Sequence, residues 1–184
     1  MSRYIAFLRA INVGSGRTIQ MKSLRLIVES LGFSNVATFL ASGNIIFETR
    51  TKNVKALEKK IEKRLRADLG FEVATFIRTD TQLKRVSYYR PFPQSKIDAA
   101  SEFNIIFLSD KPGKQSREKV RELKTATNEF RVHGREIYWL RRKEQGKSTF
   151  STIPFEKALG KRFTIRSAKT IKRMALKISE SKHD

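Results

Sequence analysis

The sequence predicts an α+β protein made of two ferredoxin-like halves in tandem, followed by a C-terminal helix. In the first 78 residues, β-rich runs and apolar helical stripes alternate in the order β-α-β-β-α-β, which is the ferredoxin-like unit. A segment around Pro91 and Pro93 interrupts this pattern, and the same element order then starts again. The expected divisions are a first half at 1–79, a linker with a short helix at 80–101, and a second half with the terminal helix at 102–184.

The first two elements are a strand and a helix. Residues 4–11 are apolar and β-prone, and turn-forming residues follow them, so a strand is expected to end near Ile11. Apolar residues then recur at helical spacing from Met21 to Leu31. Gly32 follows directly, in the position where a glycine often ends a helix.

A hairpin, a second helix and a closing strand complete the first half. Two β-rich runs, 36–40 and 45–49, flank a Ser-Gly-Asn sequence typical of a tight reversal. An apolar stripe through a charged segment predicts a helix from Val54 that stops at Gly70, with Glu62 and Arg66 spaced to pair across one turn. Residues 71–78 are expected to form the closing strand.

The second half is expected to repeat this order. Its predicted elements are a strand at 103–108, a helix at 114–124, a hairpin at 130–132 and 136–140, a polar loop at 144–148, a short helix near 154–159, a short closing strand at 162–165 and a long helix from about Arg166. The spacing of Phe39, Gly43 and Phe47 recurs in Phe130, Gly134 and Tyr138, which supports an internal duplication.

The charge of the chain favours an anionic partner. There are 39 Lys and Arg against 18 Asp and Glu, a net charge of +21 that is spread over both halves. A general positive charge also keeps a protein soluble, so the charge by itself does not define a site. No stretch has the length of a signal-peptide core or a membrane span, so we expect a cytoplasmic protein without membrane attachment.

The first candidate site is an edge where the first strand ends beside the hairpin tip. In a ferredoxin-like unit these two segments meet near the start of the first helix, whose backbone amides favour an anion. The residues expected to hold a phosphate or carboxylate there are Arg9, Asn12, Gly14, Ser42, Gly43 and Asn44. Turn chemistry alone also explains these residue types, Arg9 excepted, and that interpretation is favoured.

The second candidate site is the basic side of the terminal helix. Eight basic residues and no acidic residue occur from Lys157 to Lys177. In a helix, one stripe would carry Arg166, Lys169, Arg173 and Lys177, opposite Ala168, Ile171, Met174, Ala175 and Ile178. The basic stripe could follow a row of nucleic-acid phosphates, although amphipathic surface helices of other basic proteins look similar.

The chain contains few residues suited to enzyme catalysis. Because the chain has no Cys, disulfides, thiolate metal sites and a Cys nucleophile are excluded. The two histidines are His133, at the second hairpin tip, and His183, near the C-terminus, too few for a triad or a metal cluster. No metal and no cofactor are therefore expected, and the sequence does not specify an oligomeric state.

Several motifs resemble those of DUF1697, an uncharacterised bacterial family. They are the runs 4–14, Leu31-Gly32-Phe33 and Ser42-Gly43-Asn44 with Phe47, then Pro91-Phe92, Gly134, Tyr138, Ser148, Thr164, Arg166 and Thr170. The resemblance runs over the full length and implies two related ferredoxin-like halves in a cytoplasmic protein, without an activity to transfer. Ser167-Ala168 replaces a usual Asn-Trp, and Ser15 interrupts paired glycines, so any site built there is altered.

Two functional hypotheses follow from these observations. The first is a binding protein for an anionic partner, either a nucleic acid or a phosphate-bearing ligand. The alternative is an enzyme that acts on a small anionic metabolite held between the two halves. A structural protein whose charge only maintains solubility is a third possibility that composition leaves open.

Overall fold

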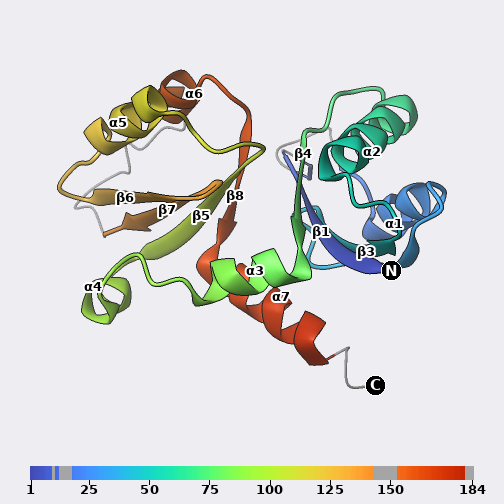
Figure 1. Cartoon of the computed structure of the whole chain (residues 1–184), viewed down its shortest axis with the longest axis horizontal. Coiled ribbons are helices and arrows are strands. Elements are labelled where there is room, and N and C mark those ends of the chain that lie inside the picture. Colours follow the sequence, from blue (N-terminus) through green and yellow to red (C-terminus); the bar gives the residue numbers. More distant parts are fainter. Residues whose placement is uncertain (10, 13–17, 143–152, 181–184) are drawn as a thin grey trace. The chain divides into compact units, whose positions relative to one another are not determined.

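The computed structural model describes residues 1–9, 11–12, 18–142 and 153–180 (Figure 1). Its elements are β1 (Ser2–Leu8), α1 (Met21–Glu29), β2 (Ser34–Thr38), β3 (Asn44–Thr49), α2 (Val54–Leu69), β4 (Thr75–Thr79), α3 (Asp80–Tyr88), α4 (Gln94–Asp98), β5 (Glu102–Leu108), α5 (Lys114–Glu122), β6 (Asn128–His133), β7 (Glu136–Arg141), α6 (Ile153–Leu159), β8 (Phe163–Ser167) and α7 (Ala168–Glu180). The polar loop predicted at 144–148 lies outside the described residues.

The strands form two four-stranded antiparallel sheets with the same topology. Their strand orders are β2-β3-β1-β4 and β6-β7-β5-β8. Each order is that of a ferredoxin-like unit. The second strand of the hairpin pairs with one side of the unit's first strand, and the unit's last strand pairs with the other side of that first strand. The predicted fold of two tandem ferredoxin-like halves with a C-terminal helix is therefore confirmed.

The chain divides into two compact units. The first contains residues 1–85 together with 177–184, and the second contains residues 86–176. The division falls inside α3 and again inside α7. The segment predicted as a linker, 80–101, carries α3 and the short α4, where the sequence had suggested a single short helix.

In the first unit, α1 and α2 cover one face of the sheet (Figure 1). Leu24 and Val28 of α1 and Leu57 and Ile61 of α2 pack in one cluster with alternate residues of the strands, including the fully buried Phe47. The apolar stripes that predicted these helices are therefore the stripes that build this core.

Two carboxylates of α2 bond to the unpaired edge of this sheet. Glu58 Oε1 accepts a hydrogen bond from the Ile77 N–H at 3.0 Å, and Glu62 Oε1 accepts one from the Thr75 N–H at 2.8 Å. Because β4 is an edge strand, these bonds satisfy N–H groups that no neighbouring strand reaches. The expected pair of Glu62 with Arg66 is thus replaced, and Arg66 Nη1 lies 3.3 Å from Glu72 instead.

The second unit has an aromatic core. Phe155 of α6 contacts Phe130 and Trp139 of the β6–β7 hairpin and Phe163 of β8. In Figure 1, α5 and α6 cover one face of this sheet, and the rings pack in one cluster with Val120 of α5 and Leu159 of α6. The Trp139 Nε1–H donates to Asn128 Oδ1 at 2.8 Å, which satisfies its polar group inside the core.

The pairing registers of the two sheets place a buried arginine at the same position. Ile5 of β1 pairs with Arg78 of β4, and Ile105 of β5 pairs with Arg166 of β8. The two arginines are 1% and 8% exposed. Each donates from Nη1 to the carbonyl of the residue before it, at 2.9 and 2.7 Å respectively. This correspondence supports the internal duplication.

The aromatic match used to predict the duplication is wrong by one residue. Phe47 pairs with Tyr4, whereas Tyr138 pairs with Ile105, the counterpart of Ile5. The residue equivalent to Phe47 is therefore Trp139. Because strand side chains alternate, this shift puts Phe47 in the core under the helices and leaves Tyr138 on the other face.

Strand boundaries near the duplicated positions also differ from expectation. β4 begins at Thr75 rather than residue 71, and β1 ends at Leu8 rather than Ile11. β8 continues to Ser167, so Arg166 lies in a strand and not in the terminal helix.

Within the described residues, no helix is both long enough and apolar enough to cross a membrane.

Candidate functional site

The predicted edge between the first strand and the hairpin tip is present in the first unit. The Leu8 N–H donates to the Gly43 carbonyl at 2.8 Å, and the Asn12 amide donates to the Ala41 carbonyl at 3.0 Å. The end of β1 and the hairpin tip therefore meet as the topology predicted.

The two asparagines of this edge are engaged with the backbone. Asn12 has a φ of 58° and bonds Ile19 twice, with Oδ1 accepting from the N–H at 2.6 Å and Nδ2 donating to the carbonyl at 3.1 Å. Asn44 is fully buried, and its Nδ2 donates to the Phe39 carbonyl and the Ser42 hydroxyl at 2.8 and 2.9 Å. These contacts favour the turn interpretation for both residues.

Gly43 is required by packing as well as by backbone conformation. Its φ is 71°, and a Cβ at this position would overlap Ile11 Cγ2 and lie 3.1 Å from Leu8 Cβ. Arg9 is held through its backbone, since its N–H donates to the Ala74 carbonyl at 2.8 Å. Gly14 lies outside the described residues. The binding role of this edge stays a prediction.

The terminal helix α7 carries its cations on the side opposite its buried residues. Ile171, Met174, Ala175 and Ile178 are buried, whereas Lys169, Lys172, Arg173 and Lys177 are exposed. Lys172 was not among the predicted residues, although its spacing places it beside Arg173. In the first unit, the Lys177 ammonium lies 5.7 Å from the centre of the Phe39 ring.

Arg166 was expected on the solvent side of this helix, and that expectation is wrong. Its side chain is buried in β8, where Nη1 donates to the Thr164 hydroxyl at 2.8 Å. Burial lowers the pKa of the Arg166 guanidinium to about 10. The β-branched residues before it favour a strand that pairs with β5, a long-range contact that the helical spacing of the sequence did not reveal.

His133 ends β6 and stacks on Tyr89, with ring centres 4.1 Å apart and an angle of 19° between the rings. This contact agrees with a structural role at the hairpin tip. In the described part of the chain, no group of three or more His, Cys, Asp or Glu side chains is placed to hold a metal ion.

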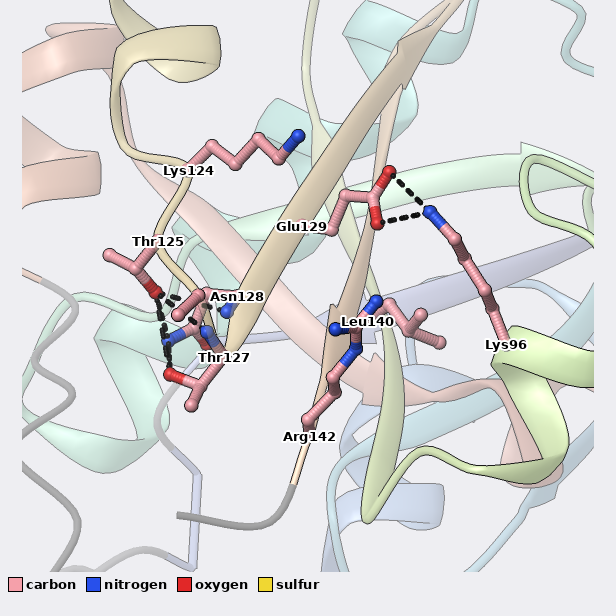
Figure 2. A pocket seen from close by; sticks show the side chains of 9 residues that line it. Lys96, Lys124, Thr125, Thr127, Asn128, Glu129, Leu140 and Arg142 are labelled. Carbon is pink, nitrogen blue, oxygen red and sulfur yellow. Dashed lines mark hydrogen bonds and ion pairs between the residues drawn. The ribbon is translucent and has the colours of Figure 1, made fainter.

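A basic pocket in the second unit was not anticipated from the sequence (Figure 2). Its volume is about 210 Å³, and Lys96, Lys124, Asn128, Glu129 and Arg142 are among its lining residues. They come from α4, the turn before β6, β6 itself and the residue that follows β7. No local motif joins these segments, so only their tertiary arrangement reveals the pocket.

Comparison with known proteins adds a family match and a structural likeness. Residues 1–138 match the sequence model of a family described as "Protein of unknown function (DUF1697)". Among solved structures, the chain is similar to the conserved bacterial protein SP0830 from Streptococcus pneumoniae, with a TM-score of 0.74, 19% identity, and coverage of 97% of this chain and 99% of that chain. At 19% identity, this similarity shows a shared fold and nothing about activity. No curated protein matches the sequence.

Proposed function

The chain belongs to the DUF1697 family of unknown function, and from that premise we propose that it binds nucleic acid through the exposed basic face of α7. The family supplies no activity, so the proposal depends on this surface alone. We keep the prediction of a cytoplasmic location, where such a partner is accessible.

The observation that carries the proposal is the separation of the two sides of α7. Ile171, Met174, Ala175 and Ile178 are buried, and the other side carries four exposed cations, Lys169, Lys172, Arg173 and Lys177, together with the exposed Leu176. No acidic residue interrupts the sequence between Lys157 and Ser179. A run of cations without a carboxylate among them attracts an external anion.

The length of this face fits a nucleic-acid backbone. From Lys169 to Lys177 the helix rises roughly 12 Å, at about 1.5 Å per residue. One DNA strand carries a phosphate about every 3.4 Å along the duplex axis, so this length spans roughly three to four phosphates. The net charge of +21 adds long-range attraction that guides such a partner toward the protein.

The test is fluorescence anisotropy of labelled single-stranded and duplex DNA and RNA over a range of salt concentrations. Each phosphate contact contributes about 0.7 to 0.9 to the slope of log affinity on log salt. We expect the triple variant Lys169→Glu, Lys172→Glu, Arg173→Glu to lower that slope by about 2 to 3 and to lose binding at physiological salt.

A matched variant reverses the same number and types of charge on another exposed helix of the same unit. Lys114, Lys119 and Arg121 of α5 serve this purpose, because they are exposed and lie outside the proposed surface. Equal loss of binding in the two triple variants would overturn the proposal. So would wild-type binding that disappears alike for every nucleic acid at physiological salt.

A further inference from the structure

The pocket of the second unit is lined by no residue of α7. Its cavity of about 210 Å³ is smaller than the roughly 300–1,000 Å³ of pockets for drug-sized ligands. Lys96, Lys124 and Arg142 line it from three different segments (Figure 2). A small anion therefore fits the pocket in both size and charge.

Among the residues that the structure describes, one carboxylate lines the pocket, and it is already neutralised. Glu129 lies 3.0 Å from the Lys96 ammonium and 2.8 Å from the Arg131 guanidinium. Burial opposes its ionisation, but the hydrogen bond from Lys96 and the positive charges of Lys96, Arg131 and Lys124 outweigh burial and lower the Glu129 pKa. The negative charge of Glu129 is therefore paired with cations of the protein itself.

The pocket lining contains two further cations, Lys124 and Arg142. Within the described ranges, neither the Lys124 ammonium nor the Arg142 guanidinium has a hydrogen bond or ion pair, and Lys124 acts on Glu129 only through its charge (Figure 2). Together with the Lys96–Glu129 pair, they give the described part of the lining an excess of two positive charges. A dianion would balance that excess.

We infer that this pocket binds the phosphate group of a small phosphate monoester, held by Lys124 and Arg142. A phosphate monoester carries about −1.5 to −2 charges at neutral pH, which matches the excess, whereas a carboxylate carries one. The planar guanidinium of Arg142 can bind two phosphate oxygens, and Lys124 supplies a point charge. The hydroxyl oxygens of Thr125 and Thr127, 3.3 Å apart, provide polar contacts on the same wall.

The single tryptophan of the chain reports on this pocket. The Trp139 indole N–H donates to Asn128 Oδ1, and Asn128 lines the cavity. The one indole N–H resonance in a proton–nitrogen spectrum should therefore shift when the pocket is occupied. Inorganic phosphate and glycerol 3-phosphate serve as probes, and sodium chloride keeps the ionic strength constant.

We expect a saturable shift of the indole resonance with both probes in the full-length protein. The variant Lys124→Gln, Arg142→Gln should weaken binding at least about tenfold, because it removes two charge-assisted contacts. The variant Lys119→Gln, Lys157→Gln loses the same charge at exposed positions outside the pocket and should bind as the wild type does.

Both substituted pocket residues are exposed, and an unshifted indole resonance without probe verifies that the fold is kept. If the double variant does not fold, Lys124→Gln and Arg142→Gln alone should each weaken binding at least about threefold. Absence of a saturable shift, or equal weakening in the pocket and control variants, would overturn the inference. Charge reversal on α7 should leave phosphate binding intact, so the two proposals fail separately.

Discussion

Gly43 allows a direct test of how tightly the hairpin tip packs on the end of β1. Replacing Gly43 with Ala forces a φ of 71° on a residue with a side chain and drives its Cβ into Ile11. The left-handed conformation costs about 1–2 kcal/mol for such a residue, and overpacking costs about 1–3 kcal/mol. We therefore expect Gly43→Ala to lower the free energy of unfolding by about 2–5 kcal/mol.

Two other glycines separate the backbone cost from the packing cost. Gly32 and Gly70 have φ values of 77° and 76°, and a Cβ at either position would meet no atom within 4 Å. Gly32→Ala and Gly70→Ala therefore carry the conformational cost alone, partly offset by about 0.4–1 kcal/mol from the reduced entropy of the unfolded chain. The excess destabilisation of Gly43→Ala over these controls measures the contact with Ile11.

Urea unfolding followed by far-ultraviolet circular dichroism is the appropriate assay. Trp139 lies in the second unit, so its fluorescence reports on a different part of the chain from Gly43. A lower midpoint with an unchanged slope would show a loss of stability rather than a change in the unfolded state. If Gly43→Ala is no more destabilising than Gly32→Ala, the inferred tight contact at the hairpin tip is wrong.

Two further predictions concern buried carboxylates. Glu58→Leu leaves the Ile77 N–H at the sheet edge without its acceptor and should lower the free energy of unfolding, measured with urea, by about 1–3 kcal/mol. Glu58→Gln keeps an acceptor and should lower it less. Equal losses of stability in the two variants would contradict this role. The folded-state pKa of Glu129 lies below its ordinary value of 4.5, so its contribution to stability is present above pH 4.5 and is lost as the pH falls further. Glu129→Gln should therefore make the melting temperature less dependent on pH between about 5 and 3, and an unchanged dependence would refute this linkage.

The order of the elements could be predicted because it depends on local patterns. The apolar stripes of α1 and α2 and the glycines that follow them are short-range signals, and so are the β-rich runs around Gly43. Two successive β-α-β-β-α-β patterns then leave few ways to pair the strands, so the sheet topology followed.

Register and strand ends were harder to predict because they depend on pairing between distant segments. Tyr138 and Phe47 share a spacing from a glycine, yet they lie on opposite faces of their sheets. Arg166 has the right spacing for the stripe of α7, but pairing with Ile105 keeps it in a strand. In both cases a shift of one or two residues, which local periodicity does not reveal, changes which side of the structure a residue occupies.

The sequence by itself determined the fold class, the excess of positive charge and the amphipathic character of the last helix, because each depends on composition or on neighbours along the chain. The tertiary structure decided the roles of individual polar residues. It engaged Asn12 and Asn44 with the backbone, and it brought Lys96, Lys124 and Arg142 around one cavity. Long-range packing alone determines which polar groups find partners inside the protein and which remain for a ligand.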